Sequence, residues 1–306
     1  MARDIIMEKL TYTNANGETI VIQTKSAVYR LLSFKDAPVR DNAQTSKGYK
    51  QNGLTYEGAQ LGPRDQAVSF LVFGNGLADL FEKRREIKRL LNPQLGEGTL
   101  VYENDYITKR ITVKFDAEPV FSTDKKNFGF HSQICYFTTT SYNPYWRDLA
   151  DTEIELVGLE DGFFWDDAVL EEPIYFEEET AFYMGEVSAA SKIVINSGDV
   201  PAPLTIEWIG AATNPKITLE DTGEYILLDK VLGANEKLII TTGYGQKTVI
   251  IETISTGAQV KDFSIVGPDS TFFSIPVGNS TVSLSADSGA ASAAVTIKYK
   301  NLFIGV

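Results

Sequence analysis

The sequence is poor in the residues that most catalytic and metal sites require. Its 306 residues include one cysteine, Cys135, and one histidine, His131. A lone cysteine excludes an internal disulfide, and the apolar run Ile134–Phe137 around it predicts a buried thiol. One cysteine and one histidine cannot supply the usual zinc ligands. No nucleophile elbow lies near His131, so we expect a structural histidine on a strand and no Ser-His-Asp triad.

Long hydrophobic stretches are also missing. No apolar run approaches the roughly 20 residues of a membrane span. The N-terminal sequence MARDIIMEKL is too charged to resemble a signal peptide. We therefore expect the chain to fold in a cytoplasm.

Positive charge is absent from one stretch of the chain. Residues 148–180 hold 13 acidic residues and no Lys or Arg, whereas residues 1–147 hold 20 basic against 16 acidic residues. The net charge of −13 argues against DNA binding by charge neutralisation. Aromatic residues interleave with the carboxylates, unlike in disordered acidic tails. Residues 148–180 are therefore predicted to be an acidic, aromatic-bearing connector that packs.

Carboxylates and tryptophans provide the remaining candidates for a chemical site. A calcium loop is one reading of the connector, but the D-x-[DN]-x-[DN]-G spacing is missing. The acids concerned are Asp161, Asp166, Asp167, Glu171 and Glu172. A glycosidase needs only two well-placed acids, which the sequence does not exclude. Trp165 and Trp208 could stack on sugar rings, although core packing is the commoner role. No residue is predicted to be catalytic, to bind a cofactor or to ligate a metal.

The first 147 residues are typical of a strand-rich domain. Leu10–Thr13 and Thr19–Ile22 flank an Asn/Gly turn and predict a hairpin. Residues 35–65 are polar and contain glycine, and a connection of this length usually reaches out of a compact domain. Gln66–Phe73 and three further runs up to Thr140 read as strands.

A single helix is expected in this domain. Apolar residues recur at helical spacing from Leu77 to Leu91, with Asn75 as N-cap and Asn92-Pro93 as the stop. Its basic residues are predicted to form a solvated face rather than an anion site; they are Lys83, Arg84, Arg85, Lys88 and Arg89. Residues 1–147 should thus form a β-barrel or sandwich with one covering helix.

Beyond residue 181 the pattern is that of a second β domain. Nine short apolar runs, including Phe272–Ile275, are separated by Gly, Asn, Pro and Asp turns. This spacing predicts a β-sandwich over residues 181–306, and the fold class is mainly β. Pro144 should end the last strand of the first domain. Tyr142, Tyr145 and Trp146 are expected to seal the lower edge of that domain.

Several motifs, in this order, resemble one protein family. They are Leu91-Asn92-Pro93 after the helix, the Gly96–Leu100 turn "GEGTL", the strand pair that ends in "ITVKFDAEPVF", and Asn143-Pro144-Tyr145-Trp146. Together they resemble the distal tail proteins of long, non-contractile phage tails, over roughly residues 20–147. The second half resembles the family more loosely, through an all-β domain that ends in "VTIKYKNLFIGV".

The resemblance implies a structural protein without enzymatic turnover. Its copies would form a closed, hexameric ring between the tail tube protein and a tail-associated hub or lysin protein. DNA would pass through the channel without specific binding. The C-terminal domain would be galectin-like and would dock receptor-binding proteins or touch cell-wall carbohydrate. The protein would reside at the distal end of the virion tail after assembly in the host cytoplasm.

Residues 35–65 are the candidate arm that would reach the next subunit of such a ring. Two alternatives stay open. The chain could be a carbohydrate-binding module or a tail-associated glycoside hydrolase that acts on the cell wall. It could also belong to a phage-tail-like bacteriocin, through which no DNA passes.

Overall fold

The structure is a computed structural model that describes residues 7–124, 126–157, 190–290 and 293–306. The chain folds into two compact units. Unit 1 comprises Met1–Leu149 and Leu302–Val306, and unit 2 comprises Ala150–Asn301. This division differs from the expected domains of residues 1–147 and 181–306. Residues 152–157 pair with strands of unit 2, whereas residues 302–303 pair with a strand of unit 1.

Unit 1 is built on a ten-stranded sheet with the order β24-β11-β8-β7-β1-β2-β3-β6-β10-β9. A further pairing of β8 with β10 closes seven of these strands into a barrel. The expected β1–β2 hairpin is present, with Leu10 opposite Ile22. The strands are β1 (Lys9–Thr13), β2 (Thr19–Gln23), β3 (Tyr29–Asp36), β6 (Arg64–Phe73), β7 (Glu97–Glu103), β8 (Thr108–Phe115), β9 (Val120–Phe121), β10 (Ser132–Ser141), β11 (Trp146–Arg147) and β24 (Leu302–Phe303).

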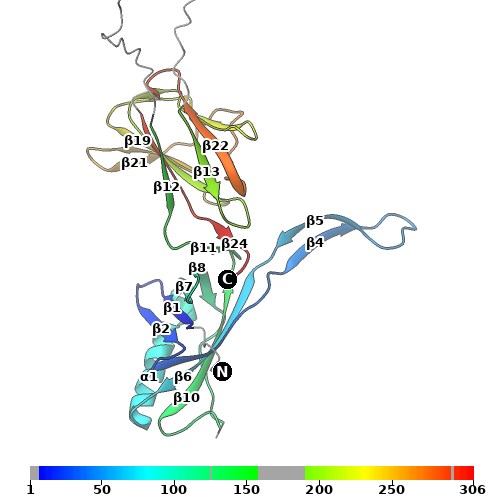
Figure 1. Cartoon of the computed structure of the whole chain (residues 1–306), viewed down its shortest axis with the longest axis vertical. Coiled ribbons are helices and arrows are strands. Elements are labelled where there is room, and N and C mark those ends of the chain that lie inside the picture. The colour runs from blue at the N-terminus through cyan, green and yellow to red at the C-terminus, as the bar shows by residue number, and fades with distance from the viewer. Residues whose placement is uncertain (1–6, 125, 158–189, 291–292) are drawn as a thin grey trace, which may run out of the picture. The chain divides into compact units, whose positions relative to one another are not determined.

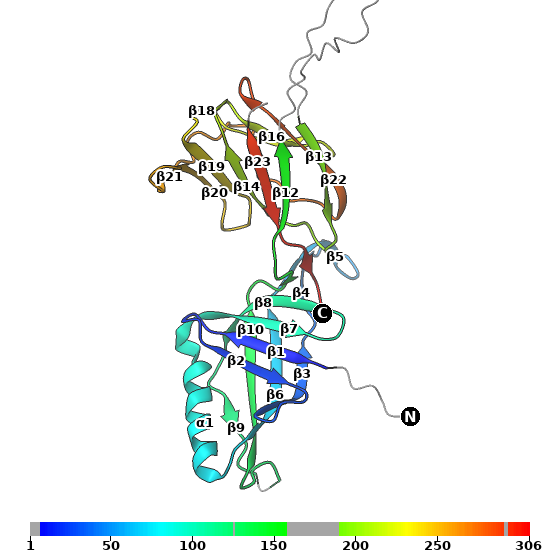
Figure 2. The same ribbon diagram turned by 60° about the vertical axis from the view of Figure 1, so that its left-hand side comes forward.

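The helix α1 (Leu77–Leu90) packs beside the barrel (Figure 2). Leu80, Ile87 and Leu90 enter the barrel core. The predicted N-cap was wrong by one residue. Gly76 precedes the helix with φ 136°, a backbone conformation that favours glycine, while the amide of Asn75 donates to the Asp79 carboxylate at 2.7 Å. After α1, a short 3-10 turn, η1 (Pro93–Leu95), is capped by the Asn92 side chain.

Alternating side chains of the strands fill the barrel with apolar groups. The Phe115 ring contacts both Tyr12, edge to face at 5.0 Å, and Phe137, also at 5.0 Å. Cys135 is buried in this core as predicted, and burial raises the pKa of its thiol to about 12. The thiol therefore stays protonated at neutral pH and acts as a small apolar group.

Gly98 in β7 allows a close approach of β1. A Cβ atom at this position would overlap the Tyr12 side chain and lie 2.6 Å from the carbonyl oxygen of Thr13. We expect Gly98→Ala to lower the free energy of unfolding of unit 1 by about 1–3 kcal/mol through overpacking. Urea unfolding followed by hydrogen exchange of residues 9–23 measures the change. A Gly48→Ala control, in an exposed turn, should cost much less, and equal effects would contradict the steric explanation.

Unit 2 is a sandwich of two antiparallel sheets around one apolar core. A six-stranded sheet has the order β12-β23-β14-β19-β20-β21 and a four-stranded sheet the order β13-β22-β16-β17, while β15 pairs with β18. The strands are β12 (Thr152–Val157), β13 (Ala190–Asn196), β14 (Leu204–Ile209), β15 (Ala212–Thr213), β16 (Lys216–Leu219), β17 (Glu224–Leu227), β18 (Val231–Leu232), β19 (Glu236–Thr241), β20 (Thr248–Thr253), β21 (Ala258–Lys261), β22 (Gly278–Ser285) and β23 (Ala294–Tyr299).

The mainly β fold class is confirmed, with α1 as the one α-helix in the described ranges. One predicted strand of unit 2 was wrong. Phe272–Ile275 contributes a single bridge between Ile275 and Ala202, because Phe272 and Phe273 lie in an irregular stretch that packs on the core. No helix within the described residues has the length and apolarity that crossing a membrane would need.

Candidate assembly site: the β4–β5 arm and its root

The residues singled out for chemistry are not gathered into a site. His131 lies exposed in the turn before β10 rather than on a strand, and its Nδ1 is 3.2 Å from the carbonyl oxygen of Gly74, which accepts the hydrogen bond. The strand prediction for this residue was wrong because Gly129 and Ser132 form a turn there. Within the described residues, no group of three or more His, Cys, Asp or Glu side chains could hold a metal ion.

The two tryptophans considered for sugar stacking have different outcomes. Trp208 is fully buried in the core of unit 2, so its ring is not available to a carbohydrate. Its indole nitrogen has no hydrogen-bond partner among the described residues. Trp165 lies outside the described residues. Most of the connector of residues 148–180 also lies outside the described residues. This includes the five acids considered for a calcium loop, namely Asp161, Asp166, Asp167, Glu171 and Glu172.

The basic face of α1 is largely paired with other groups of unit 1. Lys83 bridges to Asp79 at 3.0 Å, Lys88 bridges to Glu118 at 2.9 Å, and Arg89 bridges to Glu18. The Arg84 guanidinium lies over the rings of Phe81 and Phe121 at 4.9 and 5.0 Å. Most of these basic charges therefore already have a partner within unit 1.

The polar stretch between β3 and β6 forms an arm. It consists of β4 (Asp41–Ser46), β5 (Thr55–Leu61) and the turn between them, and it projects from the barrel of unit 1 (Figure 1). The two strands pair only with each other in the described structure, from Asp41 opposite Leu61 to Ser46 opposite Thr55. Both outer edges of this ribbon therefore lack a strand partner, which makes them available for pairing with another chain.

The surface of the arm is exposed on both sides. Every residue of Asp41–Leu61 is exposed apart from Gln51 and Gly58. Tyr49 at the turn is 93% exposed and Tyr56 on β5 is 64% exposed. An isolated two-stranded ribbon without an apolar core is at best marginally stable in water. Large exposed rings on such a ribbon are typical of a surface that another molecule covers.

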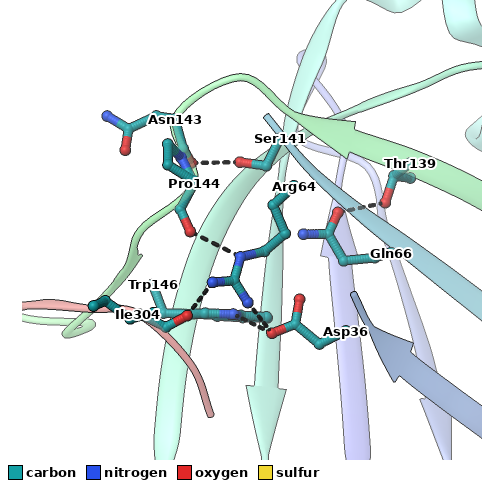
Figure 3. A network of polar contacts seen from close by, with 9 residues as sticks. All are labelled: Asp36, Arg64, Gln66, Thr139, Ser141, Asn143, Pro144, Trp146 and Ile304. Carbon is teal, nitrogen blue, oxygen red and sulfur yellow. Dashed lines mark hydrogen bonds and ion pairs between the residues drawn. The ribbon is translucent and has the colours of Figure 1, made fainter. Parts of the chain in front are cut away.

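The arm is held at its base by the arm root, which we define as Asp36, Arg64, Pro144, Trp146 and Ile304 (Figure 3). Asp36 ends β3 and Arg64 begins β6, so these two residues flank the arm. The Arg64 guanidinium donates to the Asp36 carboxylate, to the Pro144 carbonyl oxygen at 2.9 Å and to the Ile304 carbonyl oxygen. The Trp146 indole donates to the same oxygen of Asp36 at 2.9 Å.

The ion pair between Arg64 and Asp36 in the arm root is largely buried. The side chain of Arg64 is 3% exposed and that of Asp36 is 14% exposed. Such a pair persists only when hydrogen bonds satisfy both charges, because desolvation of an unpaired ion is costly. The second Asp36 oxygen, Oδ1, has no partner among the described residues, so the carboxylate depends on Arg64 and Trp146.

Residues 142–146, which follow β10, bring Pro144 and Trp146 to the arm root. Strand β10 ends at Ser141, and the Ser141 hydroxyl donates to the carbonyl oxygen of Asn143 at 2.6 Å. Trp146 is fully buried as expected, whereas Tyr142 is 64% exposed and does not seal the edge. Tyr142 follows the last residue of the strand, so its ring points away from the core.

The residues of the arm root could not be grouped from the sequence. Arg64 and Ile304 are 240 positions apart, and no local period links them. One signal was present, an arginine and an aspartate directly beside the two ends of a long polar stretch. The predicted arm of residues 35–65 is correct in position, but it is a β-ribbon rather than an unstructured connection.

Two family models match the chain. Residues 15–132 match the phage tail protein RIFT-related domain, and residues 197–303 match the siphovirus-type tail component, C-terminal domain. No curated protein matches. These matches fall on the barrel of unit 1 and the sandwich of unit 2, respectively.

Solved structures of phage tail proteins share the fold. The crystal structure of SPP1 Dit, described as a paradigm of a hub adsorption apparatus in phages that infect Gram-positive bacteria, superposes with a TM-score of 0.64 at 12% identity and covers 96% of this chain and 99% of that chain. The phage p2 baseplate in its activated conformation matches with TM-scores of 0.53 with Ca and 0.52 with Sr. In both cases the identity is 11%, with 97% of this chain and 98% of that chain covered.

The family models place a tail-component domain on each unit, in the same order as the motifs of the sequence. The solved structures share the fold over nearly the whole length. This chain is therefore a component of a siphovirus-type tail and belongs to the distal tail protein (Dit) family.

Proposed function

We propose that the chain forms a closed ring, a hexamer, at the distal end of the tail. The ring joins the tail tube to the tip apparatus that carries the receptor-binding proteins. The observation that carries this proposal is the exposed, self-paired β4–β5 arm. An arm on one side of a subunit that fits a different surface of the next gives a heterologous interface, which closes into a ring when its rotation allows.

A second open strand edge supports the same proposal. Strand β3 pairs with β6 along its whole length, but with β2 only at Arg30. From Leu31 to Asp36 its other edge has no strand partner in the described parts of the chain. Natural proteins rarely leave a long edge uncovered. An open edge beside the arm suits pairing between neighbouring copies.

The remaining partners follow from this position in the tail. One face of the ring would meet the tail tube protein, and the other would meet the hub or lysin protein. The DNA would pass through the central channel. A net charge of −13 suits a channel that does not hold phosphate, because like charges repel. In this proposal the chain performs no turnover, and assembly of the host-attachment apparatus is its whole role.

The mass of the purified protein tests the ring. Native mass spectrometry and negative-stain microscopy should give a six-fold ring with a central hole, alone or after addition of the tail tube and hub proteins. The concentration dependence should match a closed assembly without open filaments. A protein that stays monomeric at high concentration with both partners present would refute the proposal.

The carbohydrate alternative makes a different prediction. A cell-wall binding module or glycoside hydrolase would bind purified cell walls as a monomer, or release reducing sugars from them. Among the described residues the strongest stacking candidate, Trp208, is in the core. We therefore place the structural ring first. Release of sugars that is lost on mutation of one carboxylate pair would reverse that order.

A further inference from the structure

The arm root includes a part of the chain that is synthesised after all of unit 2. We call Leu302–Val306 the return segment, because it belongs to unit 1 although Ala150–Asn301 before it form unit 2. Strand β24 of the return segment pairs with β11, with Phe303 opposite Trp146. Leu302 is buried, and Lys109 lies 3.5 Å from the centre of the Phe303 ring. The return segment is thus a built part of unit 1.

We infer that the return segment controls when the arm root can form, so that the arm becomes competent to bind only after unit 2 has been made. One of the three acceptors of the Arg64 guanidinium is the carbonyl oxygen of Ile304. Until residue 304 arrives, this acceptor is missing and β11 lacks its outer neighbour. A buried arginine with an incomplete set of acceptors is unstable and draws in water.

The geometry concentrates this effect on the arm. Asp36 and Arg64 are the residues on either side of the arm, and both of their charges meet in the arm root. If Arg64 is hydrated, Asp36 retains only the Trp146 indole as a donor among the bonds of the root. The start of β6 then loses its bonds to Pro144 and to the return segment, so the base of the arm is held less firmly, by the ladders of β6 with β3 and β10 and by the Asp36–Trp146 bond. The hydrogen bonds that define the root join no residue of β1 or β2, and these two strands keep their own pairing.

The order of synthesis gives this arrangement a consequence for assembly, which rests on the proposed function. Chains fold from the N-terminus during synthesis. If the return segment did not control the arm root, an exposed arm could pair with another copy while unit 2 was still incomplete. Because the return segment follows unit 2 in the chain, the arm root can be completed only on chains in which unit 2 already exists.

Hydrogen–deuterium exchange of the full chain at low, monomeric concentration tests the inference. We expect Leu302→Ala/Phe303→Ala to speed exchange in residues 33–41 and 61–68, the two sides of the root, by roughly tenfold or more. Exchange in residues 204–209 of unit 2 should stay unchanged, and exchange in residues 9–23 of the barrel should speed up by less than exchange at the root. Equal exchange of the root in the variant and the wild type would overturn the inference. Uniform loosening of unit 1 would also overturn it, because β24 would then be a general stabiliser only.

Two further variants separate the role of Arg64 from that of β24 pairing. Arg64→Lys leaves the return segment intact but replaces the planar guanidinium fork, which reaches three separate acceptors, by a compact ammonium group, so the same root residues should exchange faster. Unchanged root exchange in this variant would contradict transmission through Arg64. The matched control is Ile304→Ala, which keeps the carbonyl acceptor and removes a side chain that is 46% exposed. It should exchange like the wild type.

The readout does not depend on ring formation, because it is taken on the monomer. A wild-type chain that never forms a ring, with variants that show the expected root exchange, would refute the proposed function. It would still support control of the arm root by the return segment. Rings that form, together with unchanged root exchange in the variants, would refute only the control of the arm root by the return segment.

Discussion

Replacement of Arg64 by methionine is expected to lower the free energy of unfolding of unit 1 by about 3–5 kcal/mol, the cost of breaking a buried ion pair from one side. The Asp36 carboxylate, on a side chain that is 14% exposed, would lose its charged partner. One of its oxygens already lacks a partner in the described structure, so no second bond can compensate. Urea-dependent hydrogen exchange of residues 9–23 measures this change, and exchange of residues 204–209 should show an unaffected unit 2.

A matched surface arginine provides the control. The Arg40 side chain is 78% exposed and lies 3.7 Å from the Asp65 carboxylate. Arg40→Met should cost less than about 1 kcal/mol, because exposed ion pairs contribute little. The double variant Asp36→Leu/Arg64→Met should recover part of the loss, since no unpaired charge remains. Similar small losses at both arginines would show that the arm root does not stabilise unit 1.

Removal of the arm should abolish ring formation while unit 1 stays folded. Asp41 lies opposite Leu61, so an Asn-Gly turn in place of residues 42–60 can close a short hairpin between them. The removed residues bury almost nothing against the barrel, so the unfolding free energy of unit 1 should change by less than about 1 kcal/mol. Mass measurement and negative-stain microscopy, with the tail tube and hub proteins present, should show only monomers.

Point variants within the arm sharpen this test. Tyr49→Ser/Tyr56→Ser should weaken assembly roughly tenfold or more, since tyrosines are frequent energetic centres of interfaces. Tyr244→Ser is the control, because Tyr244 is a fully exposed tyrosine in unit 2. Rings that form normally without the arm would show that another surface closes the assembly.

Elements with a local signal could be predicted. The β1–β2 hairpin follows from apolar runs around an Asn/Gly turn, in which the Asn14 side chain accepts hydrogen bonds from the backbone amides of Asn16 and Glu18. Helix α1 follows from apolar spacing, although its first residue depended on the backbone of Gly76. The burial of Cys135 follows from its apolar neighbours, and that of Trp146 from the large apolar ring it places at the edge of the domain.

Elements without a buried face could not be recognised as strands. Strands β4 and β5 are exposed on both sides, so no alternation of apolar and polar residues marks them. The opposite error occurred at Phe272–Ile275, where apolar composition suggested a strand and the chain makes one bridge. The candidate assembly site was therefore predicted in position, through its length and polarity, but not in form.

The sequence by itself determined the mainly β composition, the one helix, the shortage of catalytic and metal-binding side chains, and a long polar excursion after β3. Those features are local or compositional, and a short window of residues contains them. Only the tertiary structure decided that β8 meets β10 to close the barrel, and that a segment after residue 301 completes unit 1. Pairing across such distances depends on how whole sheets fit together, because the backbone groups that form the ladders are the same in every residue.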